Sequence, residues 1–139
     1  MTFALKLVEH MDEATCAALA RPDSERNRQL MPKILKAIEQ LPVRDIEDYF
    51  ALVERAVVAE LEQVPEPTVS PRRAEVALNR LGNKFSDAER SVLLRVVNYP
   101  SMTTNDTACW MVKTVFGEIL ALPAADRQVL ARVFSAPTK

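Results

Sequence analysis

The chain has 139 residues, a formal net charge of −1, 48% hydrophobic and 27% charged residues, which is typical of one globular domain with its own core. It contains two glycines, Gly82 and Gly117, where about ten are expected from average usage. Glycine supplies the positive φ angles of hairpins and phosphate-binding loops, so a sheet-rich fold would be hard to turn with two glycines. We therefore predict that residues 1–139 form a single all-α domain, a compact bundle of six or seven helices.

The small net charge hides an asymmetry between two halves of the chain. Residues 1–69 hold 8 Lys/Arg and 13 Asp/Glu, a net charge of −5, whereas residues 70–139 hold 10 and 6, a net charge of +4. Such a split lets the halves attract each other, or lets the basic half bind an acidic partner. A chance distribution of surface charges is the third interpretation.

The spacing of the cysteines and the length of the apolar runs indicate the cellular compartment of the protein. Cys16 and Cys109 lie far apart in the sequence, with no CxxC motif and no His/Cys cluster. This pattern favours reduced thiols in a cytoplasmic protein over a disulfide or a zinc site. The N-terminus has no basic-then-apolar leader, and no apolar run reaches the roughly 18 residues of a membrane span. We expect a cytoplasmic protein without a membrane or metal partner.

Apolar spacing predicts two helices at the start of the chain. The first covers residues 3–20, and the second ends at Leu41. Pro32 lies inside the second helix and leaves two interpretations. Either the helix begins near Met31 with proline in its first turn, or a kinked helix begins at Ser24.

The longest apolar stripe in the chain lies on a third helix, predicted over residues 42–64. Its members recur at intervals of three and four residues, and we expect four of them to be buried: Phe50, Val53, Val57 and Leu61. A proline-rich joint follows at about residues 64–71. It favours an extended connection between the acidic and basic halves, inside one domain.

Capping residues divide the basic half into four helices. Ser70 caps a helix that we expect to stop at Gly82 with a left-handed glycine. Ser86 and Glu89 form a capping box that opens the next helix, which ends near residue 98. The last two helices are predicted from a cap at residue 103 or 104 to residue 121, and from the Leu-Pro pair at 122–123 to residue 134.

The residue types needed for catalysis are scarce. His10 is the single histidine, and the two separated cysteines offer it no dyad or metal-ligand spacing. With Gly82 and Gly117 as its two glycines, the chain contains no GxGxxG, P-loop or GxSxG motif. We therefore predict a protein that is not an enzyme, with no catalytic residue, cofactor or metal site.

The helix ending at residue 121 carries a second seam opposite its main apolar face. The main face comprises Ala108, Met111, Val112, Val115, Ile119 and Leu122. The seam comprises Trp110, Thr114, Gly117 and Ala121. A central helix buried on both sides would explain this pattern, and so would a protein interface headed by the single tryptophan. Our main functional prediction is a small regulatory or protein–protein interaction module that self-associates, with this Trp110 seam as candidate interface.

The alternative is DNA binding. Six basic residues form a candidate patch in residues 72–95: Arg72, Arg73, Arg80, Lys84, Arg90 and Arg95. Such a patch is suited to the phosphate backbone.

A resemblance adds to this alternative. Residues 85–108 carry a capping box and apolar spacing through Phe85, Ser86, Glu89, Val92, Leu93, Val96, Pro100, Met102, Thr103 and Ala108. The segment resembles the helix 2–helix 3 region of winged helix-turn-helix regulators of the MarR kind, and that resemblance implies a DNA-binding regulator. Two departures accompany it: the apolar period continues past Ala108 without a turn, and residues 121–134 predict helix where the wing needs strands.

Overall fold

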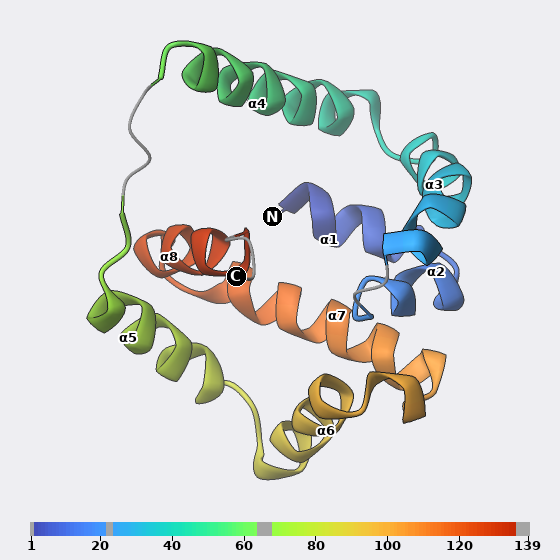
Figure 1. Cartoon of the computed structure of the whole chain (residues 1–139), viewed down its shortest axis with the longest axis vertical. Coiled ribbons are helices and arrows are strands. Elements are labelled where there is room, and N and C mark those ends of the chain that lie inside the picture. The colour runs from blue at the N-terminus through green and yellow to red at the C-terminus, as the bar shows by residue number, and fades with distance from the viewer. Residues whose placement is uncertain (1, 22–23, 64–67, 136–139) are drawn as a thin grey trace.

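The computed structural model describes residues 2–21, 24–63 and 68–135, and its regular elements there are all helices (Figure 1). The described elements are α1 (Thr2–Glu9), α2 (Glu13–Ala18), α3 (Ser24–Ile38), α4 (Val43–Leu61), α5 (Pro71–Gly82), α6 (Asp87–Asn98), the 3-10 helix η1 (Pro100–Met102), α7 (Asn105–Ala121) and α8 (Ala124–Ser135). The all-α prediction is confirmed. Within the described ranges no helix is long and apolar enough to cross a membrane.

The first predicted helix, over residues 3–20, is in fact two helices. Asp12 adopts an extended backbone, and its side chain accepts hydrogen bonds from the Thr15 amide (2.9 Å) and the Thr15 hydroxyl (2.8 Å). An aspartate in this position caps a new helix rather than continuing an old one. This break gives eight α-helices among the described residues instead of six or seven.

The second and third predicted helices correspond to α3 and α4, and each has a proline at a defining position. Helix α3 begins at Ser24 and contains Pro32, so the predicted start at Ser24 is confirmed and a start near Met31 is wrong. Pro42 precedes α4 at its N-cap, and the chain leaves α4 through Gln63, whose φ of 52° is left-handed. Residues 64–67 of the proline-rich joint lie outside the described part of the chain.

Capping chemistry is confirmed at α5 and α6 but not at Gly82. Ser70 accepts a bond from the Arg73 amide (3.4 Å), and both bonds of the Ser86–Glu89 capping box are present. The prediction of a left-handed Gly82 is wrong, because neither glycine has a positive φ. The Asn83 amide continues the helical pattern by donating to the Asn79 carbonyl (3.0 Å), so α5 ends without a left-handed residue.

Helix α7 is the centre of the fold (Figure 1). Its first half lies in a core cluster with α1, α2 and α6, and its second half lies in a cluster with α5 and α8. The predicted main face is confirmed, since four of its members are buried: Ala108, Val112, Ile119 and Leu122. One helix therefore connects the N-terminal and C-terminal halves of the chain.

A disulfide between Cys16 and Cys109 joins α2 to α7, so the prediction of reduced, separate thiols is wrong. The two residues are 93 positions apart, but their Cα atoms are 5.1 Å apart because α2 lies directly against α7. Both cysteines are buried in the first core cluster. The distance in sequence gave no indication of this proximity.

The burial predicted for the third helix is also wrong. None of the 19 residues of α4 is buried, and the four predicted core residues are exposed: Phe50 61%, Val53 37%, Val57 52% and Leu61 78%. In Figure 1, α4 lies along one edge of the molecule, away from α7. The helix forms as predicted, but the described chain supplies no cover for its apolar side.

Candidate protein-interaction site

The first half of α4 is attached to α1 by two contacts. The rings of Phe3 and Tyr49 stack with centroids 4.2 Å apart, and Lys6 Nζ lies 2.6 Å from Asp45 Oδ1. The ion pair is partly buried, with the side chain of Lys6 41% exposed and that of Asp45 19% exposed, and exposed pairs contribute at most about 1 kcal/mol. These contacts hold α4 against α1 through Asp45 and Tyr49, and the apolar stripe lies on a different side of the helix.

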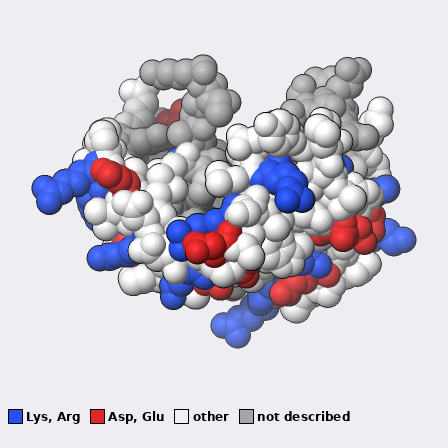
Figure 2. Space-filling model, turned by 90° about the horizontal axis from the view of Figure 1, so that it is seen from below, with Lys and Arg blue, Asp and Glu red and all other residues white. Residues whose placement is uncertain are grey.

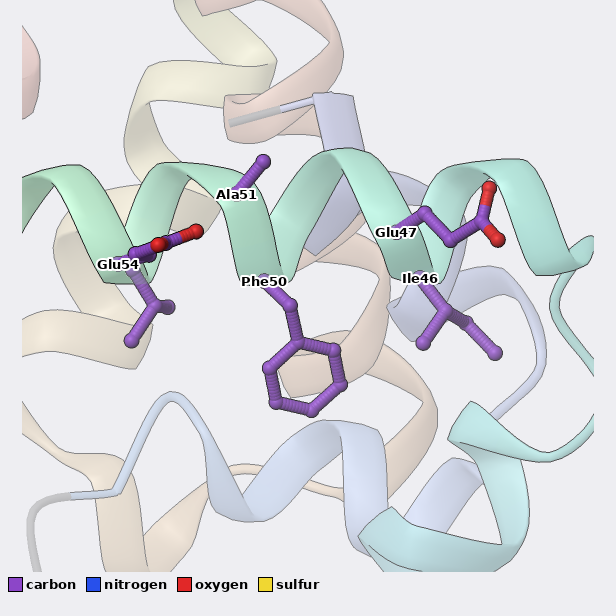
Figure 3. Close-up of a pocket in the computed structure, with 6 residues that line it drawn as sticks. Ile46, Glu47, Phe50, Ala51 and Glu54 are labelled. Carbon is purple, nitrogen blue, oxygen red and sulfur yellow. The ribbon is translucent and has the colours of Figure 1, made fainter.

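The apolar side of α4 forms a continuous stripe that is exposed from Phe50 onward and half-buried at Ile46. We define the α4 stripe by residues at helical spacing: Ile46, Phe50, Val53, Val57 and Leu61. An open cleft of about 590 Å³ lies against it, lined by Ile46, Glu47, Phe50, Ala51, Val53 and Glu54. Figure 3 shows the side chains of Ile46 and Phe50 projecting from the same side of the helix. The stripe thus presents large apolar side chains beside two carboxylates, Glu47 and Glu54.

A second apolar surface lies on the opposite half of the chain. A groove of about 410 Å³ runs between α5, α6, α7 and α8, lined by Leu78, Leu81, Gly82, Phe85, Arg90, Leu93, Leu94, Val97, Met111, Val115 and Phe134. We call this the apolar groove. Its outer members are well exposed, with Leu94 at 62% and Val97 at 67%. Arg90 supplies the charge of the lining, and its Nε donates to the Phe85 carbonyl at 3.0 Å.

The Trp110 seam is covered only in part. Trp110 is 36% exposed, Thr114 and Gly117 are half-buried, and Ala121 is exposed. A Cβ placed on Gly117 would meet nothing within 4 Å, so no neighbouring helix approaches it closely within the described chain. The interpretation that α7 is enclosed on both sides is therefore wrong on this side, and the seam stays a candidate surface.

Trp110 also lines a separate cleft at the start of α7. This cleft has a volume of about 550 Å³, and α6 and α7 line it with Ala88, Glu89, Val92, Arg95, Asp106, Thr107 and Trp110. Its charged residues have both signs, so it offers no uniform charge to a ligand. The remainder of the seam, from Thr114 onward, is not part of this lining.

The six predicted basic residues do not gather in one patch. Arg80 pairs with Asp126 at 2.7 Å, Arg90 lines the apolar groove, and Arg95 lines the Trp110 cleft. Arg72 and Arg73 line a smaller hollow that also contains Asp126. Lys84 follows α5 and is exposed. Figure 2, which views the molecule from below Figure 1, shows lysines and arginines scattered among acidic and uncharged residues.

The two departures from the winged-helix pattern are present in the structure. Helix α7 runs unbroken from Asn105 to Ala121, so the turn that would precede a recognition helix does not occur. Residues 124–135 form α8, and the described ranges contain no strand that could build a wing. Helix α7 is also enclosed on its main face, which prevents that face from entering a DNA groove.

Among the described residues, three carboxyl groups have a lowered pKa, and each lies at the start of a helix. The Thr15 amide and hydroxyl hold the pKa of Asp12 below its ordinary value. The Ser86 amide and hydroxyl do the same for the pKa of Glu89, and the Thr104 hydroxyl and Thr107 amide for the pKa of Asp106. Hydrogen bonds to an ionised carboxylate favour its charged form. These shifts belong to helix caps and indicate no proton-transfer site.

No protein-family model, no curated protein and no solved structure matches this chain. In the described part of the chain, no group of three or more His, Cys, Asp or Glu residues could hold a metal ion. The surfaces of the molecule are therefore the basis for inferring its function.

Proposed function

We propose that this protein is a small, non-enzymatic interaction module that self-associates through the α4 stripe. The observation that carries the proposal is a 19-residue helix with no buried residue, whose apolar side is exposed. Contiguous apolar patches are rare on monomeric proteins, because exposing them to water costs free energy. A helix of this kind becomes stable when a partner covers it.

The α4 stripe is a stronger candidate interface than the Trp110 seam. The stripe presents five large apolar residues in a row, whereas the seam has one aromatic residue followed by small ones. Burial of large apolar side chains provides most of the free energy of protein association. The Trp110 seam would then be a second, smaller contact surface.

Self-association is supported by the charge distribution of the chain. The stripe belongs to the acidic half, with a net charge of −5, and residues 70–139 carry +4. Two copies can therefore bring opposite charges together, which steers association and selects the partner.

DNA binding, the alternative function, has less support. Its six basic residues are divided among several places, and three of them, Arg72, Arg73 and Arg80, lie around Asp126, which pairs with Arg80. Phosphate contacts act together when they follow the path of a nucleic-acid backbone. Mobility-shift assays with duplex DNA at low salt would revive this function if they gave a salt-sensitive complex.

The compartment is a separate proposal. The disulfide between Cys16 and Cys109 supports an oxidising compartment, because cytoplasmic reductants keep most thiols reduced. The cytoplasm that the sequence led us to expect is the alternative. Alkylation of the protein directly in lysing cells tests the two: blocked cysteines support the oxidising compartment, and two alkylated cysteines support the cytoplasm.

The function is tested by the mass of the protein in solution, measured by light scattering over a concentration series. We expect an oligomer that Phe50→Glu converts to a monomer, because a charge is placed in the centre of the stripe. Leu52→Glu is the matched control, since Leu52 is 56% exposed and lies on another side of the same helix. A wild-type protein that stays monomeric at every concentration, or equal effects of both variants, would contradict the proposal.

A further inference from the structure

Two apolar surfaces lack a cover within the described part of the chain, and the segments that carry them have opposite charges. Helix α4 carries two basic and five acidic residues, a net charge of −3. Residues 71–98, which form α5, α6 and the connection between them, carry six basic and three acidic residues, a net charge of +3. The α4 stripe lies on the first of these segments, and most of the apolar groove is built from the second.

We propose that α4 of one copy docks into the apolar groove of a second copy. This inference rests on the proposed function and names the receptor surface for it. The groove of each copy is thus occupied by α4 of another copy of the same protein. The contact pairs two different surfaces, the α4 stripe and the apolar groove, and does not join α4 to α4.

The apolar residues of α4 are spaced for this kind of contact. Phe50, Val53, Val57 and Leu61 follow one another at intervals of three, four and four residues. Helices that lie in hydrophobic grooves use anchors at this spacing. Ten of the eleven residues that line the groove are apolar or glycine, and Leu94, Val97 and Phe134 remain exposed at its mouth.

Charge decides between the groove and a second α4 as the docking surface. Glu47 and Glu54 line the cleft beside the α4 stripe. Pairing of two α4 helices would bring these carboxylates near their counterparts, and like charges at an interface are unfavourable. The groove instead has no acidic residue in its lining, which contains Arg90, and Lys84 lies next to Phe85. Arg90 also lies 3.8 Å from Asp87, which is outside that lining.

A reciprocal exchange of α4 would close the assembly. If each copy inserts its helix into the other, the dimer has twofold symmetry and contains the same contact twice. Both copies then have both surfaces covered. Two contacts also help to reach the roughly 1,200–2,000 Å² that a stable interface buries.

The first experiment compares the two sides of the contact. Phe50→Glu damages the α4 stripe, and Leu94→Glu damages the groove at a residue that is 62% exposed. We expect each to weaken dimerisation at least roughly tenfold in Kd, the loss of one interface hot spot. Leu52→Glu on α4 should leave Kd unchanged, and matching far-UV circular dichroism spectra of all three variants would show that folding is intact.

The second experiment mixes the two damaged proteins. A Leu94→Glu copy keeps an intact α4, and a Phe50→Glu copy keeps an intact groove. We expect light scattering to show dimers in the mixture, because one of the two contacts can form again. The expected heterodimer is weaker than the wild-type dimer, which has both contacts.

The outcomes distinguish this inference from the proposed function. A Leu94→Glu protein that dimerises with the Kd of the wild type, confirmed with Val97→Glu, would overturn the groove as receptor while the α4 stripe remained the interface. Failure of the mixture to form dimers would overturn the reciprocal contact in the same way. A monomeric wild-type protein would overturn both proposals together.

Discussion

Helices α4 and α7 have similar lengths and opposite environments. Each carries an apolar stripe at helical spacing, and α4 has the longer one. Helix α7 contributes to both core clusters, whereas α4 has no buried residue and lies against α1 at its first turns. An apolar stripe shows that a helix needs a cover, but it does not show whether the cover comes from the same chain or from another copy.

The largest expected effect on stability comes from removing the disulfide that joins α7 to α2. The double variant Cys16→Ala, Cys109→Ala removes a bond that closes a loop of 93 residues. We expect a loss of about 4–5 kcal/mol in the free energy of unfolding, because the unfolded chain regains the entropy of that loop. Urea denaturation measures this loss, and a reductant should lower the stability of the wild type but not of the variant. A wild type indifferent to reductant would contradict the bond.

Replacing one apolar side chain on each helix by alanine compares how far α7 and α4 are buried in the monomer. Ile119→Ala on α7 should cost about 2–5 kcal/mol, since Ile119 is fully buried and the substitution leaves a cavity. Leu61→Ala on α4 should cost less than about 0.5 kcal/mol, the usual range for exposed positions. Both are measured by urea denaturation in the Phe50→Glu background, so that only the monomer contributes. Similar losses at the two positions would show that α4 is covered within the monomer.

The cap of α2 tests how firmly this helix supports α7. Asp12→Ala should cost about 1 kcal/mol, because the Thr15 amide loses its acceptor. Hydrogen bonds lower the folded pKa of Asp12, so the stability it contributes is present above the unfolded pKa of about 4 and is lost as pH falls through the lower folded pKa. This contribution is small, because the side chain is exposed.

Asp12→Asn is the control for that measurement. Asparagine keeps an acceptor at the N-cap and has no proton to gain. Thermal melts between neutral and acidic pH should therefore show a smaller acid loss in Asp12→Asn than in the wild type. An equal loss would place the acid sensitivity in other carboxylates.

The smallest effect concerns the open side of α7. Gly117→Ala should raise the stability of the monomer by about 0.5–1 kcal/mol, because alanine costs less entropy than glycine in a helix and its Cβ meets no atom within 4 Å. Gly82→Ala, equally open and helical, is the control for the gain in stability only, because Gly82 lines the apolar groove. If Gly117→Ala weakened association, a second chain would approach α7 at the Trp110 seam.

The sequence determined the local elements of this protein. Its shortage of glycine predicted an all-α fold, the caps at Ser70 and Ser86 placed the starts of α5 and α6, and the main face of α7 was identified correctly. These features depend on residues within about one or two helical turns of each other, so the sequence contains them directly. The break at Asp12 was missed, although an aspartate followed three residues later by Thr15 is a local cap that could have been found.

Tertiary structure alone decided which surfaces are covered. The pairing of Cys16 with Cys109 depends on α2 lying against α7 across 93 residues, and no local pattern encodes that contact. The exposure of the α4 stripe and the assembly of the apolar groove from four helices depend on long-range packing in the same way. The hydrophobic effect is non-directional, so an apolar stripe predicts burial without selecting its partner, and only the arrangement of the helices makes that selection.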